Sequence, residues 1–510
     1  MSKRTKTVKA IFIAAVIAAS LPVSAQTILT MERALDIAEQ NSPTMKTSYM
    51  SMQRQQELLD AQKASLKSQF RLTLNPVTYS QSRQVDSYTS NWYTNKTFNT
   101  QGTFRVDQPI LFTDGTLSLT NTFGWQNSES SRQNSTTTSK RFSNNLNVSL
   151  TQPLFTYNTQ KMELRELELD YENSIINYAL QRMSTEQSIT SQFYSVFSAQ
   201  ERLKIAEVEL ENAKQNFELI KNRVEIDLQP RSELYQAEVT FANSQSSYES
   251  QIVTLENAKD RLKQTLGLPM DEDIVVTIGE IQFSQIDIDI DKAVAHAFRT
   301  RLELRQREIT TENLYNQLIR TKAQNEFSGS LSLSMGLSGD DEKFTDIYSQ
   351  PTQSPRIALS LNVPIFDWGA KKARVKAQEI SIDINSINAE EELRTMEVNI
   401  RQTIRNLENL VNQVSIMDQS QRNAQLTYDL NTVMYREGEI TGMEMSQYET
   451  QLSSAKINYI SAIIDYRTEL LNLKIMTLWD FENNVTAVPD LAAIRTSVDA
   501  LTSKNKRKNR

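Results

Sequence analysis

The sequence predicts a mainly α-helical protein with a set of membrane-type β-strands, built by internal tandem duplication. Two stretches of about seventy residues lack proline and glycine almost entirely and have coiled-coil spacing. Each follows a segment in which apolar and small polar residues alternate. The motif Pro153-Leu154-Phe155 before the first stretch recurs as Pro364-Ile365-Phe366, 211 residues later. Such a repeat at a fixed offset indicates duplication.

Residues 1–25 have the pattern of a secretory signal peptide. Four cations precede an apolar run over 10–19, and the small residues Val23-Ser24-Ala25 follow it. We expect cleavage before Gln26 and export of the mature chain. The alternative, a single anchoring helix, fits less well because the run is shorter than the roughly 20 residues that a membrane span requires. Any later crossing of a membrane must then use β-strands.

The composition argues against several functional classes. The chain has no cysteine, which removes disulfides and thiolate metal sites. Its net charge of −7 disfavours nucleic acid as a partner. The single histidine, His296, lies among alanines on a predicted helix, and the sequence has no phosphate-binding glycine loop and no Cys/His cluster. We therefore expect that the protein is not an enzyme and that it has no cofactor and no metal site.

Two offsets define the repeats. Downstream of Pro153 the offset stays at 211, so that Glu238 aligns with Glu449. Upstream it is 259, as for Ala34 and Ala293. The difference, 48 residues, indicates an insertion in the first half.

From these offsets we expect a signal peptide (1–25); a first repeat (26–266) with strands over about 71–153, a long helix over 155–226 and a helix over 231–266; an equatorial linker (267–290); a second repeat (291–481) with strands over about 330–364, a long helix over 370–437 and a helix over 443–478; and a C-terminal segment (482–510) with a basic, disordered tail.

The long helices have apolar residues three and four positions apart, as at Leu203, Ala206 and Leu210. Each would be on the order of 100 Å long. An ordinary long coiled coil would explain this spacing equally well. It would not explain why two shorter helices in each half, of roughly 35 residues each in the first half, together match one long helix.

The strands have one apolar face and one face of Ser, Thr and Asn, as in the run from Leu331 to Leu337. Outer-membrane barrels use this pattern, and a soluble hairpin could use it too. Four to six strands cannot close a barrel, because the smallest have about eight. If the strands span a membrane, several chains must share one barrel. The insertion adds a candidate hairpin over about 97–127, which either joins the wall or projects as a loop.

The signal peptide, the tandem halves, the strand pairs and the strand-to-helix turns together resemble the TolC family of outer-membrane factors, also called outer membrane efflux proteins. The turn residues that carry the resemblance are Pro153, Phe155, Pro364, Phe366, Trp368 and Gly369. The resemblance implies a homotrimer in the cell outer membrane with a shared twelve-stranded β-barrel and a long α-helical barrel projecting into the periplasm. It also implies a passive duct for tripartite efflux or type I secretion. The implied partners are a periplasmic membrane-fusion adaptor and an inner-membrane pump of the RND or ABC type. Because the inserted hairpin departs from the family pattern, the wall could have eighteen strands, and we slightly favour twelve.

The same resemblance points to the two helix-turn-helix tips as the periplasmic gate. The candidate residues are Asp227, Glu233, Tyr435, Gly438 and Glu444. Gly438 suits a left-handed turn position, and Asp227 is its poorer equivalent. Carboxylates repeated around a narrow axis would favour cations. Alternatively, the glutamates are solvated residues at helix starts, where the helix dipole favours them.

One other class of function fits part of the sequence. An exported, soluble coiled-coil tether or adaptor would explain the heptads and the signal peptide. It would not explain why both halves repeat the strand pair and the turn. The sequence does not identify the exported substrate.

Overall fold

The computed structural model describes residues 27–85, 90–132, 135–278, 286 and 288–496. The predicted signal peptide, part of the predicted equatorial linker and the basic tail lie outside these residues. The chain divides into two compact units. Unit 1 comprises Met1–Ser51, Ile175–Leu304 and Glu391–Arg510, and unit 2 comprises Met52–Ser174 and Arg305–Glu390. Each unit therefore contains segments from both halves of the sequence.

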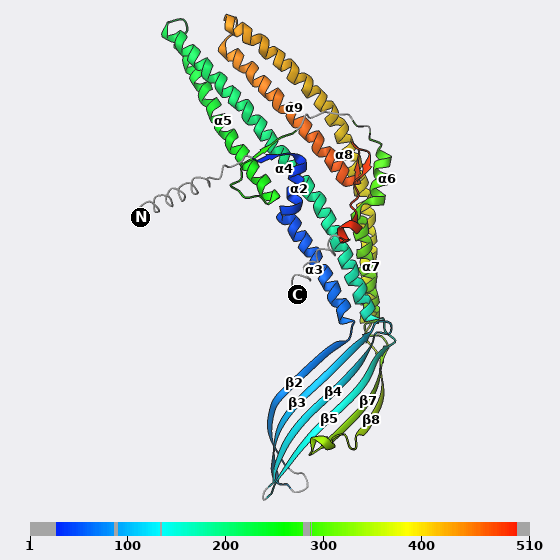
Figure 1. Ribbon diagram of the computed structural model, residues 1–510. Helices are drawn as coiled ribbons and strands as arrows, with labels where there is room; N and C mark the ends of the chain where they lie inside the picture. Colours follow the sequence, from blue (N-terminus) through cyan, green and yellow to red (C-terminus); the bar gives the residue numbers. More distant parts are fainter. Residues whose placement is uncertain (1–26, 86–89, 133–134, 279–285, 287, 497–510) are drawn as a thin grey trace, which may run out of the picture. The chain divides into compact units, whose positions relative to one another are not determined.

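Unit 2 contains one antiparallel sheet of six strands in the order β2-β3-β4-β5-β7-β8 (Figure 1). Four strands come from the first half and two from the second. Their bounds are β2 Gln69–Val85, β3 Trp92–Ile110, β4 Gly115–Arg132, β5 Ser135–Leu154, β7 Ser328–Asp341 and β8 Thr352–Asn362. β5 pairs with β7, from Leu154 opposite Gly329 to Phe142 opposite Asp341, so the sheet joins the two halves.

The inserted hairpin is part of this sheet. β3 pairs with β2 and β4 pairs with β5 along nearly their whole lengths. Each chain therefore has six strands in one sheet, two more than the four on which the slight preference for twelve in a trimer rests, and the number of strands in the wall stays a prediction. The insertion alternates apolar and polar residues in the same phase as its neighbours, which lets its backbone hydrogen-bond into the sheet without reversing the faces.

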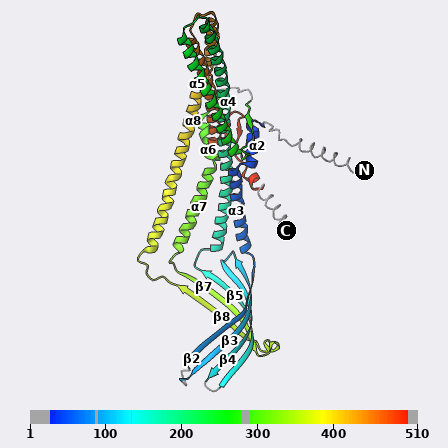
Figure 2. The same cartoon turned by 90° about the vertical axis from the view of Figure 1, so that its left-hand side faces the viewer.

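Four helices of unit 2 meet the same end of the sheet (Figures 1 and 2). α3 (Pro43–Ser65) leads into β2, and α7 (Leu302–Ala323) leads into β7. α4 (Thr159–Glu225) follows β5, and α8 (Ala370–Glu437) follows β8. Among the described residues, no helix combines the length and the apolar character needed to cross a membrane.

Unit 1 contains the rest of these helices and two further pairs. α2 (Met31–Asn41) and α6 (Ile290–Thr300) are short, whereas α5 (Arg231–Leu266) and α9 (Gly442–Thr477) have 36 residues each. β1 (Thr27–Leu29) pairs in parallel with β6 (Ile274–Val276). β9 (Trp479–Asp480) pairs with β10 (Val485–Thr486) in the antiparallel sense.

Unit 1 has two main hydrophobic cores, and they are built from equivalent positions of the two halves. In the first core, Ala34 and Ala38 of α2 pack with Ile189, Phe193 and Leu262. In the second core, the residues at the same offsets do so: Ala293, Ala297, Ile400, Ile404 and Leu473. The alanines let the short helix approach the long one closely, because they have no side chain beyond Cβ.

The helix ends also correspond between the halves. α5 ends at Gly267, with φ +73°, and α9 ends at Leu478, with φ +54°. The turns after α4 and α8 contain Asp227 with φ +58° and Gly438 with φ +82°. Each half thus repeats the left-handed backbone, although only one member of each pair is the glycine that such a backbone favours.

Replacing Gly267 by alanine tests how closely the end of α5 packs against α2. Its new Cβ would approach the backbone carbonyl of Asn41 more closely than real Cβ atoms do, whereas nothing lies within 4 Å of the Cβ built at Gly438. Gly438→Ala should cost about 1 kcal/mol from the left-handed backbone alone. Gly267→Ala should cost about 1–3 kcal/mol more, because α2 or α5 must shift. Thermal unfolding of both variants in detergent measures the difference, and equal losses would contradict this packing.

Candidate functional site

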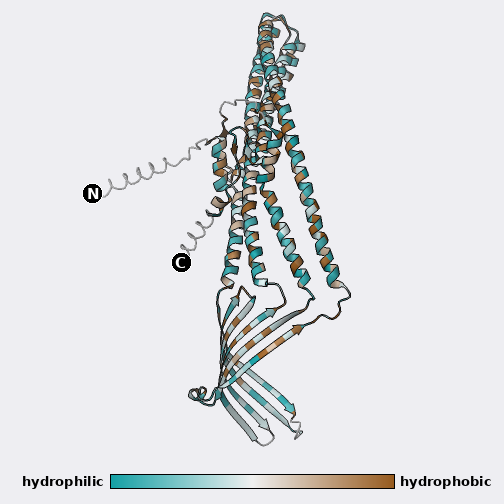
Figure 3. Cartoon of the chain, turned by 90° about the vertical axis from the view of Figure 1, so that its right-hand side faces the viewer, coloured by the Kyte–Doolittle hydropathy of each residue, from teal (hydrophilic) through white to brown (hydrophobic). Residues whose placement is uncertain are grey.

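One face of the six-stranded sheet is apolar on every strand. Residues opposite each other in the register point to the same side of an antiparallel sheet. One row runs from Leu72 through Phe104 to Asn121 and Leu146, and then to Leu337. Large apolar side chains on this face are exposed in the single chain: Phe70, Leu72, Leu74, Phe104, Leu117, Leu119, Val148, Met335, Leu337, Ile357, Leu359 and Leu361. Figure 3 shows the hydrophobic residues gathered in the half of the sheet next to the helices.

The other face is polar and carries its own interactions. Arg105 forms an ion pair of 2.8 Å with Asp107, and Ser118 donates to the same carboxylate at 2.5 Å. Arg141 of β5 reaches Asp340 of β7 at 2.9 Å. Serine, threonine and asparagine fill most of the remaining positions, such as Thr120, Asn147 and Ser334. A sheet with these two faces separates an apolar medium from water.

The loop between β7 and β8 covers the outer end of the apolar face. Phe344 lies 5.6 Å from Phe123 and 6.1 Å from Phe142, ring centre to ring centre. Ile347 is buried, and a Cβ at Gly339 would collide with the carbonyl oxygen of Ile347. This loop bounds the exposed apolar region on the side away from the helices.

The predicted strand-to-helix turns differ between the halves. Phe155 has φ +60° and lies 5.0 Å from the ring of Phe327. In the second turn, Trp368 has φ +56°, Gly369 has φ +80°, and the rings of Phe366 and Trp368 lie 4.8 Å apart. Trp368 is 89% exposed in the single chain. Pro153 is the second-last residue of β5, whereas Pro364 lies beyond the end of β8.

Two carboxylates at these turns were not predicted. Asp367 accepts hydrogen bonds from the backbone N–H groups of Gly369 and Lys371 and so caps α8.

Asp114, from the turn of the inserted hairpin, accepts hydrogen bonds from the backbone N–H of Gln160 at 3.0 Å and from the hydroxyl of Thr159. Asn158 adds a cap to Lys161 and a 2.6 Å bond to the carbonyl of Leu111. The hairpin turn therefore supports the start of α4. An Asp before Gly was the only sequence signal for this role.

Of the candidate tip residues, Glu233 and Tyr435 lie at a groove, whereas Asp227 and Gly438 form the two turns. Glu233 and Thr441 line one groove together with Asn216, Ile220, Ala237 and Met443. Tyr435 donates its hydroxyl to Asn216. Burial raises the pKa of Tyr435, while Arg223 opposes that rise. Asp227 and Gly438 form the turns themselves, and their role at a gate stays a prediction.

Glu444 makes a local contact. It accepts from the backbone and the hydroxyl of Thr441 at 2.8 and 2.9 Å, and Thr441 accepts from the backbone of Glu444. This reciprocal capping box starts α9. The hydrogen bond from the backbone of Thr441 lowers the pKa of Glu444. The arrangement supports the helix-start interpretation of this residue, which was one of the two alternatives.

A half-buried carboxylate near the tips, Glu449, is not predicted by the sequence. Glu449 of α9 accepts a hydrogen bond from Asn212 of α4, which also donates to the hydroxyl of Tyr428 at 3.3 Å. Burial raises the pKa of Glu449, which the bond from Asn212 only partly offsets. The residue lies among coiled-coil positions, and a glutamate there is usually a surface residue, so its burial could not be predicted from the sequence.

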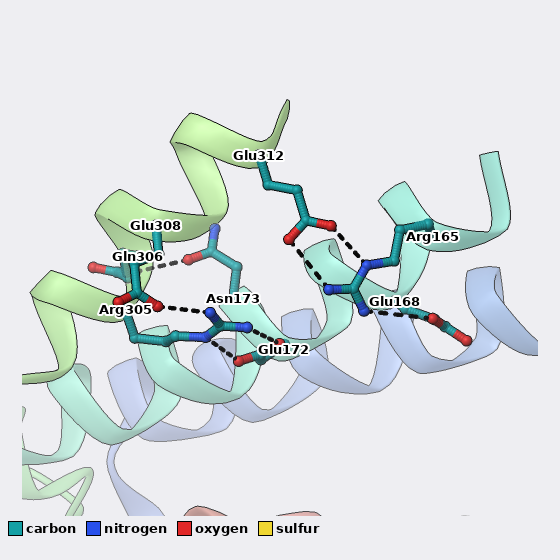
Figure 4. A network of polar contacts seen from close by, with 8 residues as sticks. All are labelled: Arg165, Glu168, Glu172, Asn173, Arg305, Gln306, Glu308 and Glu312. Atoms are coloured by element: carbon teal, nitrogen blue, oxygen red, sulfur yellow. Dashed lines mark hydrogen bonds and ion pairs between the residues drawn. The ribbon is translucent and has the colours of Figure 1, made fainter. Parts of the chain in front are cut away.

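A polar network joins the two halves within unit 2 (Figure 4). Arg305 of α7 pairs with Glu172 of α4 at 2.6 Å, and Arg165 of α4 pairs with Glu312 of α7 at 2.8 Å. Gln306 donates to Asn173 at 2.9 Å. These side chains are more than a third exposed, so each pair contributes only about 0.2–1 kcal/mol. These pairs mainly fix the alignment of α4 with α7, because each arginine binds its carboxylate through two parallel hydrogen bonds.

His296 has structural contacts. Its Nδ1 lies 2.8 Å from the carbonyl oxygen of Thr477, and its ring packs 4.9 Å from that of Trp479. Within the described part of the chain, no three His, Cys, Asp or Glu side chains are grouped so as to hold a metal ion.

Two glutamates of α9 should respond to pH with opposite signs. The raised pKa of Glu449 means that the folded protein favours its neutral form, so its ionisation destabilises the fold as pH rises above the ordinary value of 4.5. Glu449→Gln should therefore raise the melting temperature at neutral pH, and the gain should vanish in acid.

Glu444→Gln is the matched control. The lowered pKa of Glu444 means that its ionised form stabilises the fold, and that this contribution is lost as pH falls through the lowered pKa. Glu444→Gln should lower the melting temperature slightly at neutral pH. Melting curves of both variants between pH 4 and 8 check the pair, and a loss of stability in Glu449→Gln at neutral pH would contradict the burial.

Comparisons with known proteins identify the family and the fold of the chain. The family model described as outer membrane efflux protein matches residues 116–268 and 320–477, more than half of the chain and one match in each half. A search of curated proteins finds no match.

Solved structures share the fold at low sequence identity. The CmeC outer membrane channel of Campylobacter jejuni has a TM-score of 0.68 and 14% identity, over 92% of this chain and 89% of that one. The open state of the MtrE outer membrane channel of Neisseria gonorrhoeae has a TM-score of 0.63 and 15% identity, over 88% of each chain. The outer membrane protein VceC of Vibrio cholerae has a TM-score of 0.62 and 12% identity, over 87% of this chain and 94% of that one.

The resemblance predicted from the turns and the duplication is thus confirmed, as is the fold class of long helices, membrane-type sheet and tandem repeats. The chain belongs to the outer membrane efflux protein family, and it is an efflux channel of the outer membrane and not an enzyme, with its long helices on the periplasmic side.

Proposed function

We propose that three copies of this chain form a passive exit duct that completes a tripartite efflux or type I secretion system. The observation that carries the proposal is the sheet of unit 2, with an exposed apolar face on all six strands and a polar opposite face. Such a sheet is stable with lipid on one side and water on the other. Export by the predicted signal peptide, 1–25, would deliver the chain to the periplasm.

The number of strands supports assembly. Six strands leave two open edges, β2 and β8. In lipid, unpaired backbone groups at such edges would each cost several kcal/mol, so a spanning sheet must be closed. One chain has fewer strands than the smallest closed barrels. A threefold assembly closes the wall around a water-filled space lined by the polar face.

The tips are the proposed contact for the adaptor and, through it, for an RND or ABC pump. Both helix turns carry exposed apolar side chains, among them Ile226, Leu228 and Met443, which are 66%, 70% and 69% exposed. Apolar residues gathered at the end of a polar coiled coil are typical of a protein contact. The gate roles of Asp227, Glu233, Tyr435, Gly438 and Glu444 belong to this proposal.

The soluble tether or adaptor is the alternative function. It would leave the apolar face of the sheet in water, because among the described residues of unit 2 only the β7–β8 loop lies over it. A contiguous apolar face of this extent is unusual for a soluble monomer. The face therefore favours the channel.

A charge placed on either face of β7 distinguishes the two environments. Leu333 and Ser332 are neighbours that point to opposite faces. Leu333→Lys should cost roughly 2–4 kcal/mol per copy, because it places a cation in lipid, and should reduce the amount of folded protein in the outer membrane. Ser332→Lys should insert normally. Equal insertion of the two variants would contradict the lipid-facing assignment.

Conductance tests the duct. The purified protein should require detergent, behave as a trimer and produce ion-conducting steps in planar lipid bilayers. A monomer or dimer that stays soluble without detergent and gives no conductance would instead establish the tether.

A further inference from the structure

We propose that the inserted hairpin makes the wall of this channel eighteen-stranded, six strands from each of three copies, with β2 of one copy paired to β8 of the next. The inference rests on the trimer proposed above. It adds the size of the wall and the contact between copies.

The faces of the inserted hairpin match the rest of the sheet. Val106 and Leu119 lie opposite each other on the apolar face, and Leu119 faces Val148 of β5. On the polar face, Thr103 and Thr122 lie 3.4 Å apart, hydroxyl to hydroxyl. In a loop projecting into water, nothing would require the apolar and polar residues of β3 and β4 to alternate in step with the other strands. A strand pair in a membrane wall must keep it.

The inserted hairpin pairs along nearly its whole length, and its turn lies at the end of the sheet next to the helices. Its turn is held there by Gln152, whose side-chain amide donates to the carbonyl of Thr113 at 2.5 Å. Asp114 in the same turn caps the start of α4. The hairpin is therefore built into the strand-to-helix junction and is not appended at the opposite end.

The two open edges are complementary. Every residue of β2 is exposed, as is every residue of β8 except Ala358. β2 runs away from the helices and β8 returns to them, so β2 and the β8 of a neighbour can pair in the antiparallel sense. Aligning their helix-side ends places Gln69 opposite Asn362.

This alignment matches the side chains on both edges. It brings three apolar pairs together on the apolar face: Phe70 with Leu361, Leu72 with Leu359, and Leu74 with Ile357. It also sets Pro76 opposite Pro355. Neither proline has an N–H group, so both lie where the ladder between copies can end without losing a bond. A bulge in β2 between Asn75 and Thr78 marks the same level.

The stagger of the sheet fits closure by three copies. The register carries Gln69 of β2 across the sheet to Arg356 of β8, by way of Asp107, Ser118, Ser149 and Ser334. Arg356 lies about six residues before Asn362, so each copy shifts the register by about six residues over six strands. With about 3.3 Å per residue and about 4.8 Å between strands, this corresponds to a strand tilt of roughly 35°. Closed barrels need about that tilt.

The consequence is a wide exit. Barrel diameter grows almost linearly with the number of strands, so eighteen strands give a wall roughly 1.5 times as wide as twelve. Barrels of sixteen to eighteen strands leave an aqueous channel.

Cysteine pairs test the contact between copies on a natural cysteine-free background. Opposite residues of antiparallel strands have Cα atoms about 4.5–5.5 Å apart, within reach of a disulfide. The double variant Leu72→Cys with Leu359→Cys, purified as the channel and oxidised, should migrate as a covalent trimer in a denaturing gel. Leu72→Cys with Ala358→Cys is the control, since Ala358 points to the polar face, and it should remain monomeric.

A third pair tests the other arrangement of the wall. If the hairpin lay outside the wall, β2 would pair directly with β5. The equivalent pair in the second half is Leu331 with Leu359, so the repeat offsets would set Leu72 opposite Val148, and Leu72→Cys with Val148→Cys would form a disulfide within one chain. In the eighteen-stranded wall these residues are roughly 16 Å apart and should stay reduced. That internal disulfide in a conducting trimer would overturn the inference and leave the proposed function intact. A protein that forms neither trimers nor conductance would overturn both.

Discussion

Backbone hydrogen bonding at the two edges of the sheet is the constraint on which the rest of the structure depends. A strand in lipid has no water to satisfy its N–H and C=O groups, so a membrane sheet must close on itself. One chain provides six strands with open edges at β2 and β8. In the proposed trimer, the open edges of each copy pair with those of its neighbours and so complete the wall.

The duplication extends this requirement to the helices. Each half provides a long helix after its last strand, α4 or α8, and a shorter pair, α3 with α5 or α7 with α9. The two cores of unit 1 use equivalent alanines, which keep α2 and α6 close to the long helices. In unit 2, the arginine pairs between α4 and α7 align helices from different halves. The two halves therefore pack their helices through equivalent residues.

Much of this fold could be predicted from the sequence, because heptads, alternation and repeats are local patterns. The absence of proline and glycine placed the long helices, and the structure begins α4 at Thr159, a few residues after the expected start. The difference arises because Asp114 and Asn158 cap the helix there, and Asp114 comes from a distant turn. The left-handed geometry of Asp227 was also accessible, through its alignment with Gly438.

What the sequence did not reveal depends on tertiary pairing. Alternation marked the inserted segment as strands but could not say which strands it would join, so twelve was slightly favoured over eighteen. The register of β3 with β2 and of β4 with β5 shows that the segment pairs with the strands on both sides of it. Glu444 and Glu449 look alike in the sequence, five residues apart on one helix. Only the structure separates a capping carboxylate from one that is half-buried beside Asn212.

Imaging of the purified particle by electron cryo-microscopy in a lipid nanodisc tests the central claim most directly. The account predicts a threefold particle whose membrane section is one closed wall, with the apolar faces of all six strands per copy turned toward lipid. A particle in which the sheet of each copy stays separate, or in which those faces pack against protein in water, would contradict it.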